Sequence, residues 1–203
     1  MNVWPLALLT RANDGFARRL ALIQPHQWTA TTPCAAWDVR GLVNHVVGAN
    51  RRSTMLLHGA AADEVDATRV ADHLGDDPVA SFVTTTAELT TAFREPGAMS
   101  RIAHHPAGER TGAQLLATRV VDVTVHTWDL ARSIGADESL DPAAVDFALT
   151  LRDTFEVGRR RGSFAPPSGE SPADVSAQAR LLHLSGRRSS AVKPSNTATT
   201  LCS

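Results

Sequence analysis

The chain has 203 residues, a formal net charge of −1 and an even mix of 20 basic and 21 acidic residues. This length allows one domain with a sizeable core, and a second full domain does not fit. The even charge gives no broad basic surface, which excludes nucleic acid and anionic membranes as first partners. Two distant cysteines, Cys34 and Cys202, and the lack of a leader or of about 18 consecutive apolar residues predict a soluble, cytoplasmic protein.

Residues 5–24 are predicted to form a first helix, with Pro5 in its first turn and Pro25 as its stop. Its buried stripe recurs at steps of three and four: Leu6, Leu9, Asn13, Phe16, Leu20 and Ile23. Such a stripe is typical of a helical bundle. A structured connection follows, in which Trp28 and Trp37 are available to cover the end of the core.

A second helix is predicted to begin at Asp38, which can cap it, and to run to about Gly59. It carries His45 in an apolar context, where a histidine is either a satisfied core side chain or a ligand. Gly41 and Gly48 lie on the same face, four residues before and three after His45. Because glycine costs a helix interior up to ~1 kcal/mol, we interpret the pair as leaving space for a ligand cleft beside the imidazole.

Residues 60–77 are small and acidic, which predicts a long loop with a partial helical turn. A third helix is then expected from Pro78, capped by Asp77, to the Pro96–Gly97 pair. Residues 99–112 are rich in turn formers and favour a small hairpin or an extended crossover. This segment carries two adjacent histidines, His104 and His105. We expect one of them to face solvent and neither to be a metal ligand.

Residues 111–134 are predicted to form one long helix. Thr111 and Gln114 have the spacing of a capping box, and no Pro or Gly interrupts the run before Gly135. Apolar residues cover most of its circumference, so this helix is expected to be central.

Asp122 and His126 lie four residues apart on that helix, so their side chains can converge on one point. The pair is either an ordinary solvent-facing charge contact or two ligands of a divalent metal. A third ligand must then come from elsewhere, and a partner histidine is sought. Asp129 is expected to accept a hydrogen bond or to have a structural role at the helix end, not to bind metal.

A fifth helix is expected from Asp141–Pro142 to about Val157, and a last short helix within 173–186. The sequence therefore predicts an all-α domain over 1–187, with four main helices and one crossover after the second or third. Residues 188–203 lack apolar periodicity and are expected to be a disordered, dispensable tail.

Three segments resemble one known family: TPCAAWDVRGLVNHVVG at 32–48, VVDVTVHTWDLARSIG at 120–135 and RLLHLSGR at 180–187. They are similar to the DinB-like metal-binding superfamily, in the actinobacterial branch related to mycothiol-dependent maleylpyruvate isomerase. The resemblance implies a four-helix bundle with a long crossover, a small hairpin before the late helix and extra C-terminal helices. It also implies that His45, Asp122 and His126 bind a divalent metal, with zinc favoured and nickel the other choice.

The function implied by the resemblance is that of a metal-dependent S-transferase or isomerase. Such a protein uses a low-molecular-weight thiol such as mycothiol or bacillithiol on a small electrophile. Arg119 or Arg52 would hold an acidic group of the thiol cosubstrate, the alternative for both being a surface salt bridge. Cys34 is interpreted as a small core residue.

Two other classes of function stay open from the sequence. A metal-dependent hydrolase would use the same three ligands with water as its nucleophile. A non-enzymatic bundle that binds metal or an effector is equally compatible. The sequence contains no recognisable general acid or base besides the ligands, so catalytic residues are not assigned, and a homodimer is left open.

Overall fold

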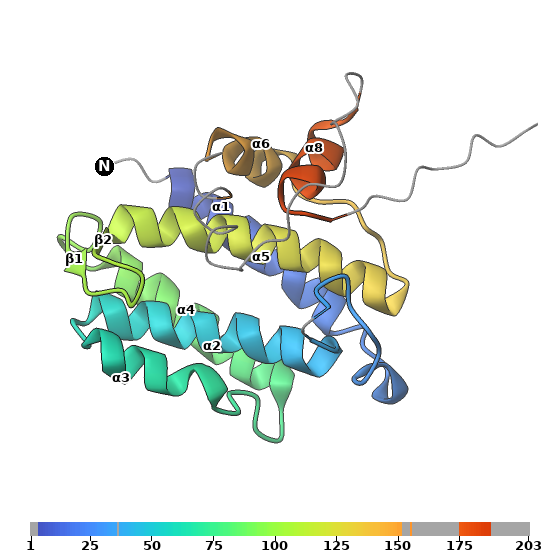
Figure 1. Cartoon of the computed structure of the whole chain (residues 1–203), viewed down its shortest axis with the longest axis horizontal. Helices are drawn as coiled ribbons and strands as arrows, with labels where there is room; N and C mark the ends of the chain where they lie inside the picture. Colours follow the sequence, from blue (N-terminus) through green and yellow to red (C-terminus); the bar gives the residue numbers. More distant parts are fainter. Residues whose placement is uncertain (1–3, 36, 152–154, 156–174, 188–203) are drawn as a thin grey trace, which may run out of the picture.

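Four long helices pack side by side as a bundle in a computed structural model, which describes residues 4–35, 37–151, 155 and 175–187 (Figure 1). They are α1 (Trp4–Leu20), α2 (Val39–Leu57), α4 (Pro78–Arg94) and α5 (Gly112–Ile134). Within the bundle α1 packs on α4 and α5, and α2 packs on the same two helices. The predicted all-α bundle is confirmed.

The connection between α2 and α4 is the predicted long crossover. It contains α3 (Ala62–Ala67) and the 3-10 turn η2 (Thr68–Val70), so more of it is helical than the sequence indicated. Figure 1 shows that this segment travels back along α2, so that α2 and α4 run in the same direction. The segment contacts α2 along its length. One flank of α2 is therefore covered by residues 60–77.

The helices begin where the capping residues predict. Asp38 Oδ1 accepts a hydrogen bond from the Gly41 amide at 2.8 Å, and Asp77 Oδ1 accepts one from Ala80 at 2.9 Å. At α5, Thr111 and Gln114 form the complete capping box. Such caps are each worth about 1 kcal/mol, and here they fix the register of the helices that carry the site.

The first helix ends at Leu20 rather than at residue 24, so its predicted C-terminal end was wrong. Ala21 and Leu22 still bond back to α1, but Gln24 is extended, with φ −82° and ψ 153°. The residue before a proline disfavours helical backbone, and Pro25 itself starts the 3-10 turn η1 (Pro25–Gln27). Helical backbone is therefore disfavoured just before the proline, and the apolar stripe, which continues to Ile23, extends beyond the end of the helix.

The predicted hairpin joins α4 to α5. Its strands β1 (Ile102–Ala103) and β2 (Arg110–Thr111) are antiparallel, with Ile102 opposite Thr111. A Cβ on Gly112 would lie 1.9 Å from the Ala98 carbonyl oxygen, so only glycine lets α5 start against this turn. The hairpin is thereby held closely at one end of the bundle.

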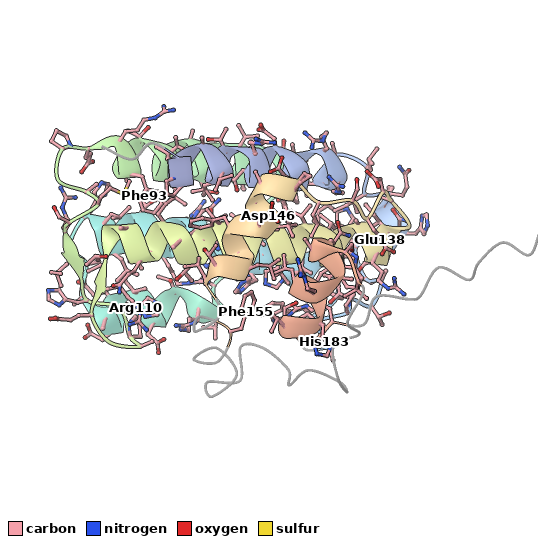
Figure 2. The ribbon with its side chains drawn as sticks, turned by 90° about the horizontal axis from the view of Figure 1, so that it is seen from above. Phe93, Arg110, Glu138, Asp146, Phe155 and His183 are labelled. Atoms are coloured by element: carbon pink, nitrogen blue, oxygen red, sulfur yellow. The ribbon has the colours of Figure 1, made fainter. Side chains whose placement is uncertain are left out.

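Helix α5 is central, as predicted, because it packs on two separate cores. One face joins the main bundle core through Leu116, Val120 and Val123. The opposite face joins a second core through Val121, Val125 and Trp128. That second core is completed by α6 (Pro142–Thr150) and α8 (Ala177–Leu184), which lie over α5 (Figure 2).

The C-terminal expectations are tested only in part. Described helix α6 ends at Thr150, and most of the predicted extension to Val157 lies outside the described residues. The last helix occupies 177–184 of the predicted 173–186, capped by Ser176. The predicted tail, 188–203, also lies outside them. None of the described helices is long and apolar enough to cross a membrane.

Candidate metal centre

His45 on α2 meets Asp122 and His126 on α5 at the contact between the two helices. The Nε2 atoms of both histidines lie 3.4 Å from the same carboxylate oxygen, Asp122 Oδ1. The two imidazole rings are edge to face, with centroids 5.0 Å apart. One ligand atom from each side chain lies within 4.8 Å of the others. The structure therefore brings together all three residues named from the sequence.

The donor set fits a divalent transition metal. Two imidazole nitrogens and a carboxylate oxygen suit zinc, nickel or iron better than calcium or magnesium. Atoms bound to one tetrahedral zinc at about 2.0–2.1 Å lie roughly 3.3–3.4 Å from each other, and both histidine-to-aspartate distances have this value. Metal binding itself remains a prediction.

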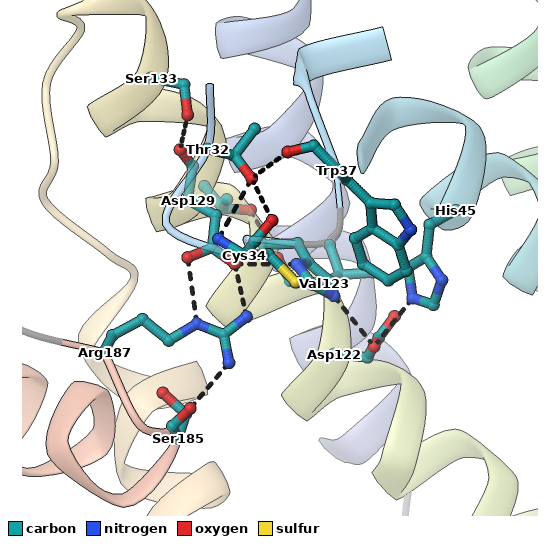
Figure 3. A network of polar contacts seen from close by, with 12 residues as sticks. Thr32, Cys34, Trp37, His45, Asp122, Val123, Asp129, Ser133, Ser185 and Arg187 are labelled. Carbon is teal, nitrogen blue, oxygen red and sulfur yellow. Dashed lines mark hydrogen bonds and ion pairs between the residues drawn. The ribbon is translucent and has the colours of Figure 1, made fainter. Parts of the chain in front are cut away.

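His126 is oriented by a chain of buried polar groups that starts at Arg187, just after the end of α8. Its Nδ1 lies 2.9 Å from Asp129 Oδ2. Asp129 is fully buried and accepts two hydrogen bonds from Arg187, at 3.1 and 2.7 Å (Figure 3). Because a carboxylate on Nδ1 favours a proton there, Nε2 is left to face Asp122. Asp129 is thus the acceptor that the sequence predicted.

The charges around His126 determine its protonation in the metal-free protein. Burial alone would lower its pKa, but the charge of Asp122 and hydrogen bonds to Asp122 and Asp129 raise the pKa to about 9. The imidazole is therefore protonated at neutral pH until a metal competes with that proton. With only 5% of its surface exposed, His126 is not the solvent-facing contact that was the alternative.

Asp122 is held from its other side by Arg119. The guanidinium donates to Asp122 Oδ2 and, at 2.8 Å, to Asn50 Oδ1 on α2. Asn50 in turn donates to Thr86 on α4 at 3.1 Å. Arg119 is only 4% exposed, so the surface salt bridge considered for it is wrong. Its role in holding a cosubstrate stays a prediction, since this guanidinium already orients the carboxylate.

The surroundings of Asp122 and His45 favour the protonation states that metal binding requires. Burial would raise the pKa of Asp122, but His45, His126 and Arg119 hold it well below its ordinary value. Burial lowers the pKa of His45, despite the opposing charge of Asp122. A charged carboxylate beside a neutral imidazole is the protonation state that metal ligands require.

The glycines on either side of His45 leave room for side chains of this chain, not for a ligand. A Cβ on Gly41 would lie 3.2 Å from the Cβ of Trp37. A Cβ on Gly48 would lie 2.4 Å from the His73 ring and 2.8 Å from Arg52 Nη1. The prediction that both glycines open a ligand cleft was therefore wrong. Gly48 lets the 60–77 segment pack closely on α2.

A cavity of about 150 Å³ opens beside His45 and Asp122. Its walls come from α2, α5, the 60–77 segment and the hairpin: Ala49, Arg52, Ser53, Leu56, Val65, Arg69, His105, Leu115, Thr118 and Arg119. A cavity of this size holds a molecule such as benzene. It is large enough for a small electrophile or the sulfur-bearing end of a thiol.

Arg52 is one of three arginines in the wall of this cavity, with Arg69 and Arg119. It is 9% exposed, so its surface salt-bridge alternative is wrong, and no hydrogen bond or ion pair links it to any other described residue. Burial, together with the charges of Arg69 and Arg119, lowers its pKa to about 10. The guanidinium is therefore still charged at neutral pH, and it has no hydrogen-bond acceptor within the described part of the chain.

Sequence reasoning missed three parts of this site. Trp37 stacks on His45. The four-residue spacing of Trp37, Gly41 and His45 was the sequence signal that could have indicated this contact. Arg187 contacts Asp129, which lies 58 residues earlier in the chain, and no local sequence pattern predicts a contact between residues so far apart. His105 lines the cavity with Nδ1 accepting from the Ala107 amide at 3.0 Å, whereas the neighbouring His104 is exposed, as expected for one of the pair.

Comparisons with known proteins agree with this architecture. The family model of the mycothiol maleylpyruvate isomerase N-terminal domain matches residues 9–131, which include all three converging side chains. Two Mycobacterium tuberculosis proteins, uncharacterized proteins MT0763 (strain CDC 1551 / Oshkosh) and Rv0738 (strain ATCC 25618 / H37Rv), are each 32% identical over 168 residues. The alignment covers 83% of this chain and 88% of each relative.

One solved structure is similar in fold. The crystal structure of the mycothiol-dependent maleylpyruvate isomerase superposes with a TM-score of 0.59 and 17% identity. The match covers 74% of this chain and 68% of that chain. At this identity the likeness concerns the fold alone.

Proposed function

The chain belongs to the family of the mycothiol maleylpyruvate isomerase N-terminal domain, and from this we propose that it is a metal-dependent S-transferase or isomerase. It binds one divalent ion, zinc before nickel, through His45, Asp122 and His126. It then uses a low-molecular-weight thiol, of which mycothiol is the type, on a small electrophile in the cytoplasm.

The observation that carries this proposal is the cavity that reaches the three-residue cluster. His45 and Asp122 belong to both, so a small molecule in the cavity lies next to the ligand atoms. When bound, a divalent ion at this place favours the thiolate form of a thiol at neutral pH. The chain supplies the rest: Asp129 keeps the proton of His126 on Nδ1, and Arg119 keeps Asp122 charged.

Arg52 is proposed to hold an acidic group of the thiol or of the electrophile. A buried guanidinium is stabilised by a carboxylate, which it can bind through two parallel hydrogen bonds. Arg52 has no such partner among the described residues and lines the cavity together with Asp122. The apolar wall formed by Leu56, Val65 and Leu115 would contact the carbon skeleton.

Cobalt-loaded protein gives the test, because sulfur bonded to cobalt produces a strong near-ultraviolet charge-transfer band. We expect mycothiol and simple thiols to produce this band. Thiols that carry a carboxylate should bind more tightly, so 3-mercaptopropionate should titrate at lower concentration than 2-mercaptoethanol. If mycothiol, bacillithiol and both simple thiols all leave the spectrum unchanged, a hydrolase or a non-catalytic metal protein is preferred.

The neighbouring arginine provides a matched control for the acidic group. Arg51 is exposed, whereas Arg52 is buried in the cavity wall. Arg52→Gln should abolish the preference for 3-mercaptopropionate, and Arg51→Gln should keep it. Equal preference in both variants would contradict the role of Arg52 and leave the thiol proposal intact.

A further inference from the structure

The two histidines of the cluster differ in what holds their rings. His126 is fixed by Asp129 on its second nitrogen. For His45, the one polar ring contact within the described residues is the long 3.4 Å approach of Nε2 to Asp122. Histidines that bind metals almost always use their other nitrogen for a hydrogen bond that sets the ring plane. Some other contact must do this for His45.

The indole of Trp37 makes that contact. It stacks on the His45 ring at 4.4 Å between centroids, with 25° between the planes. The same indole meets the His126 ring at 5.7 Å and 57°. Figure 3 shows Trp37 lying against His45, with Asp122 at the edge of that imidazole. One aromatic side chain therefore touches both nitrogen ligands.

The backbone beneath this indole is itself held in place. The Trp37 carbonyl accepts a hydrogen bond from Thr32 Oγ1 at 2.8 Å, and the Trp37 amide donates to the Cys34 carbonyl at 2.9 Å. Thr31 also pairs with Asp38, the cap of α2. The turn that carries Trp37 is thereby fixed to the start of the helix that carries His45.

Gly41 leaves the space that the indole occupies. It lies one turn after Trp37 and one turn before His45. A Cβ at this position would come within 3.2–3.3 Å of Trp37 Cβ and Cδ1 and of Asp38 Oδ1. The backbone of Gly41 is ordinary helix, so conformational freedom does not explain the residue. Close approach of the indole does.

We infer that Trp37 is a positioning residue for His45, and that Gly41 lets Trp37 lie this close to the start of α2. The stacked indole holds the His45 ring so that Nε2 faces Asp122 and His126. The inference rests on the proposed metal site and concerns this chain's own aromatic contact. The stacked indole takes the place of the hydrogen bond that usually orients a ligand histidine through its second nitrogen.

Cobalt titration of the full chain tests the inference through the visible absorption of the bound ion. Trp37→Ala should weaken cobalt binding by about 10–100-fold, the usual loss when support behind a ligand is removed. Trp37→Phe keeps an aromatic face and should restore binding to within about threefold of the parent. Trp28→Ala is the control, since Trp28 is half-buried in the same connection and packs on the main core.

Gly41→Ala separates positioning from folding. Alanine favours the helix over glycine by up to about 1 kcal/mol, which offsets its close contacts with Trp37 and Asp38, so the melting temperature of the metal-free variant should not fall. Cobalt binding should weaken because Trp37 must shift. The inference is overturned if Trp37→Ala binds cobalt as tightly as the parent, or if Trp28→Ala loses as much affinity. A parent protein that takes up no cobalt overturns the metal proposal and this inference together.

Discussion

Two imidazoles, one on α2 and one on α5, reach the same oxygen of Asp122, and different kinds of contact hold them. On α5, His126 is held by charge, through Asp129 and the buried guanidinium of Arg187. On α2, His45 is held by packing, through the Trp37 face and the closely covered helix behind it. We call the His126–Asp129–Arg187 contacts the charged side and the Trp37–His45 stack with Gly41 and Gly48 the packed side. The charged side is sensitive to the loss of one member of an ion pair. The packed side is sensitive to a side chain added at either glycine.

Breaking the charged side should have the largest effect. Asp129→Asn removes a fully buried carboxylate and leaves Arg187, which is 8% exposed, without its buried counter-ion. Removing one partner of a buried pair costs about 3–5 kcal/mol. We expect the free energy of unfolding of the metal-free protein to fall by that amount in urea denaturation.

A solvent-exposed pair supplies the control for Asp129. Arg40 and Asp72 lie 3.0 Å apart with both side chains about half exposed. Arg40→Gln should cost at most about 1 kcal/mol, as loss of an exposed ion pair does. Similar losses in the two variants would contradict the structural role given to burial.

Overfilling the packed side should have an intermediate effect. Gly48→Ala would place a methyl group 2.4 Å from the His73 ring and 2.8 Å from Arg52 Nη1, so both side chains would have to shift. Overpacking of this kind costs about 1–3 kcal/mol, against a gain of up to ~1 kcal/mol from helix propensity. A net loss of stability is expected by thermal unfolding. A variant more stable than the parent would mean that the His73 and Arg52 side chains move aside without cost.

Removing the cap of α2 should have a smaller effect. Asp38→Ala deletes the acceptor for the Gly41 amide, which costs about 1 kcal/mol. Because Trp37 still covers His45, the cobalt dissociation constant should change little. A large loss of cobalt affinity with unchanged stability would show that Asp38, not Trp37, sets the position of His45.

The smallest effect is expected at the C-terminal end. Arg187 makes the last contact that the structure describes with the site, so a chain that ends after residue 190 keeps the charged side complete. Its melting temperature should match that of the full chain in calorimetry. A fall of many degrees would mean that residues 191–203 contact the domain.

Local sequence signals predicted the helix starts and the convergence of Asp122 with His126. Asp38, Asp77 and Thr111 act through neighbours three residues away, so capping could be inferred without the fold. Asp122 and His126 lie on one helix face. Only the family resemblance linked them to His45, because helix pairing is not written in local spacing.

The rest of the site depends on tertiary contacts. Whether Gly41 and Gly48 border a cleft or a packed side chain depends on what lies opposite, and Trp37 and His73 lie there. The burial of Arg52 and Arg119 depends on the crossover segment and on the α2–α5 contact. The contact of Arg187 with Asp129 could not be predicted, because the periodicity of the sequence before Arg187 does not indicate where this arginine lies relative to α5.

Zinc content is the most direct test of the claim that the two sides form one metal site. The parent protein and the His45→Ala, Asp122→Asn and His126→Ala variants would be loaded with zinc, freed of excess by gel filtration and analysed for metal and for helix content. We expect about one zinc per chain in the parent and little in either histidine variant, with helix content unchanged. If both histidine variants keep as much zinc as the parent, the site is misassigned.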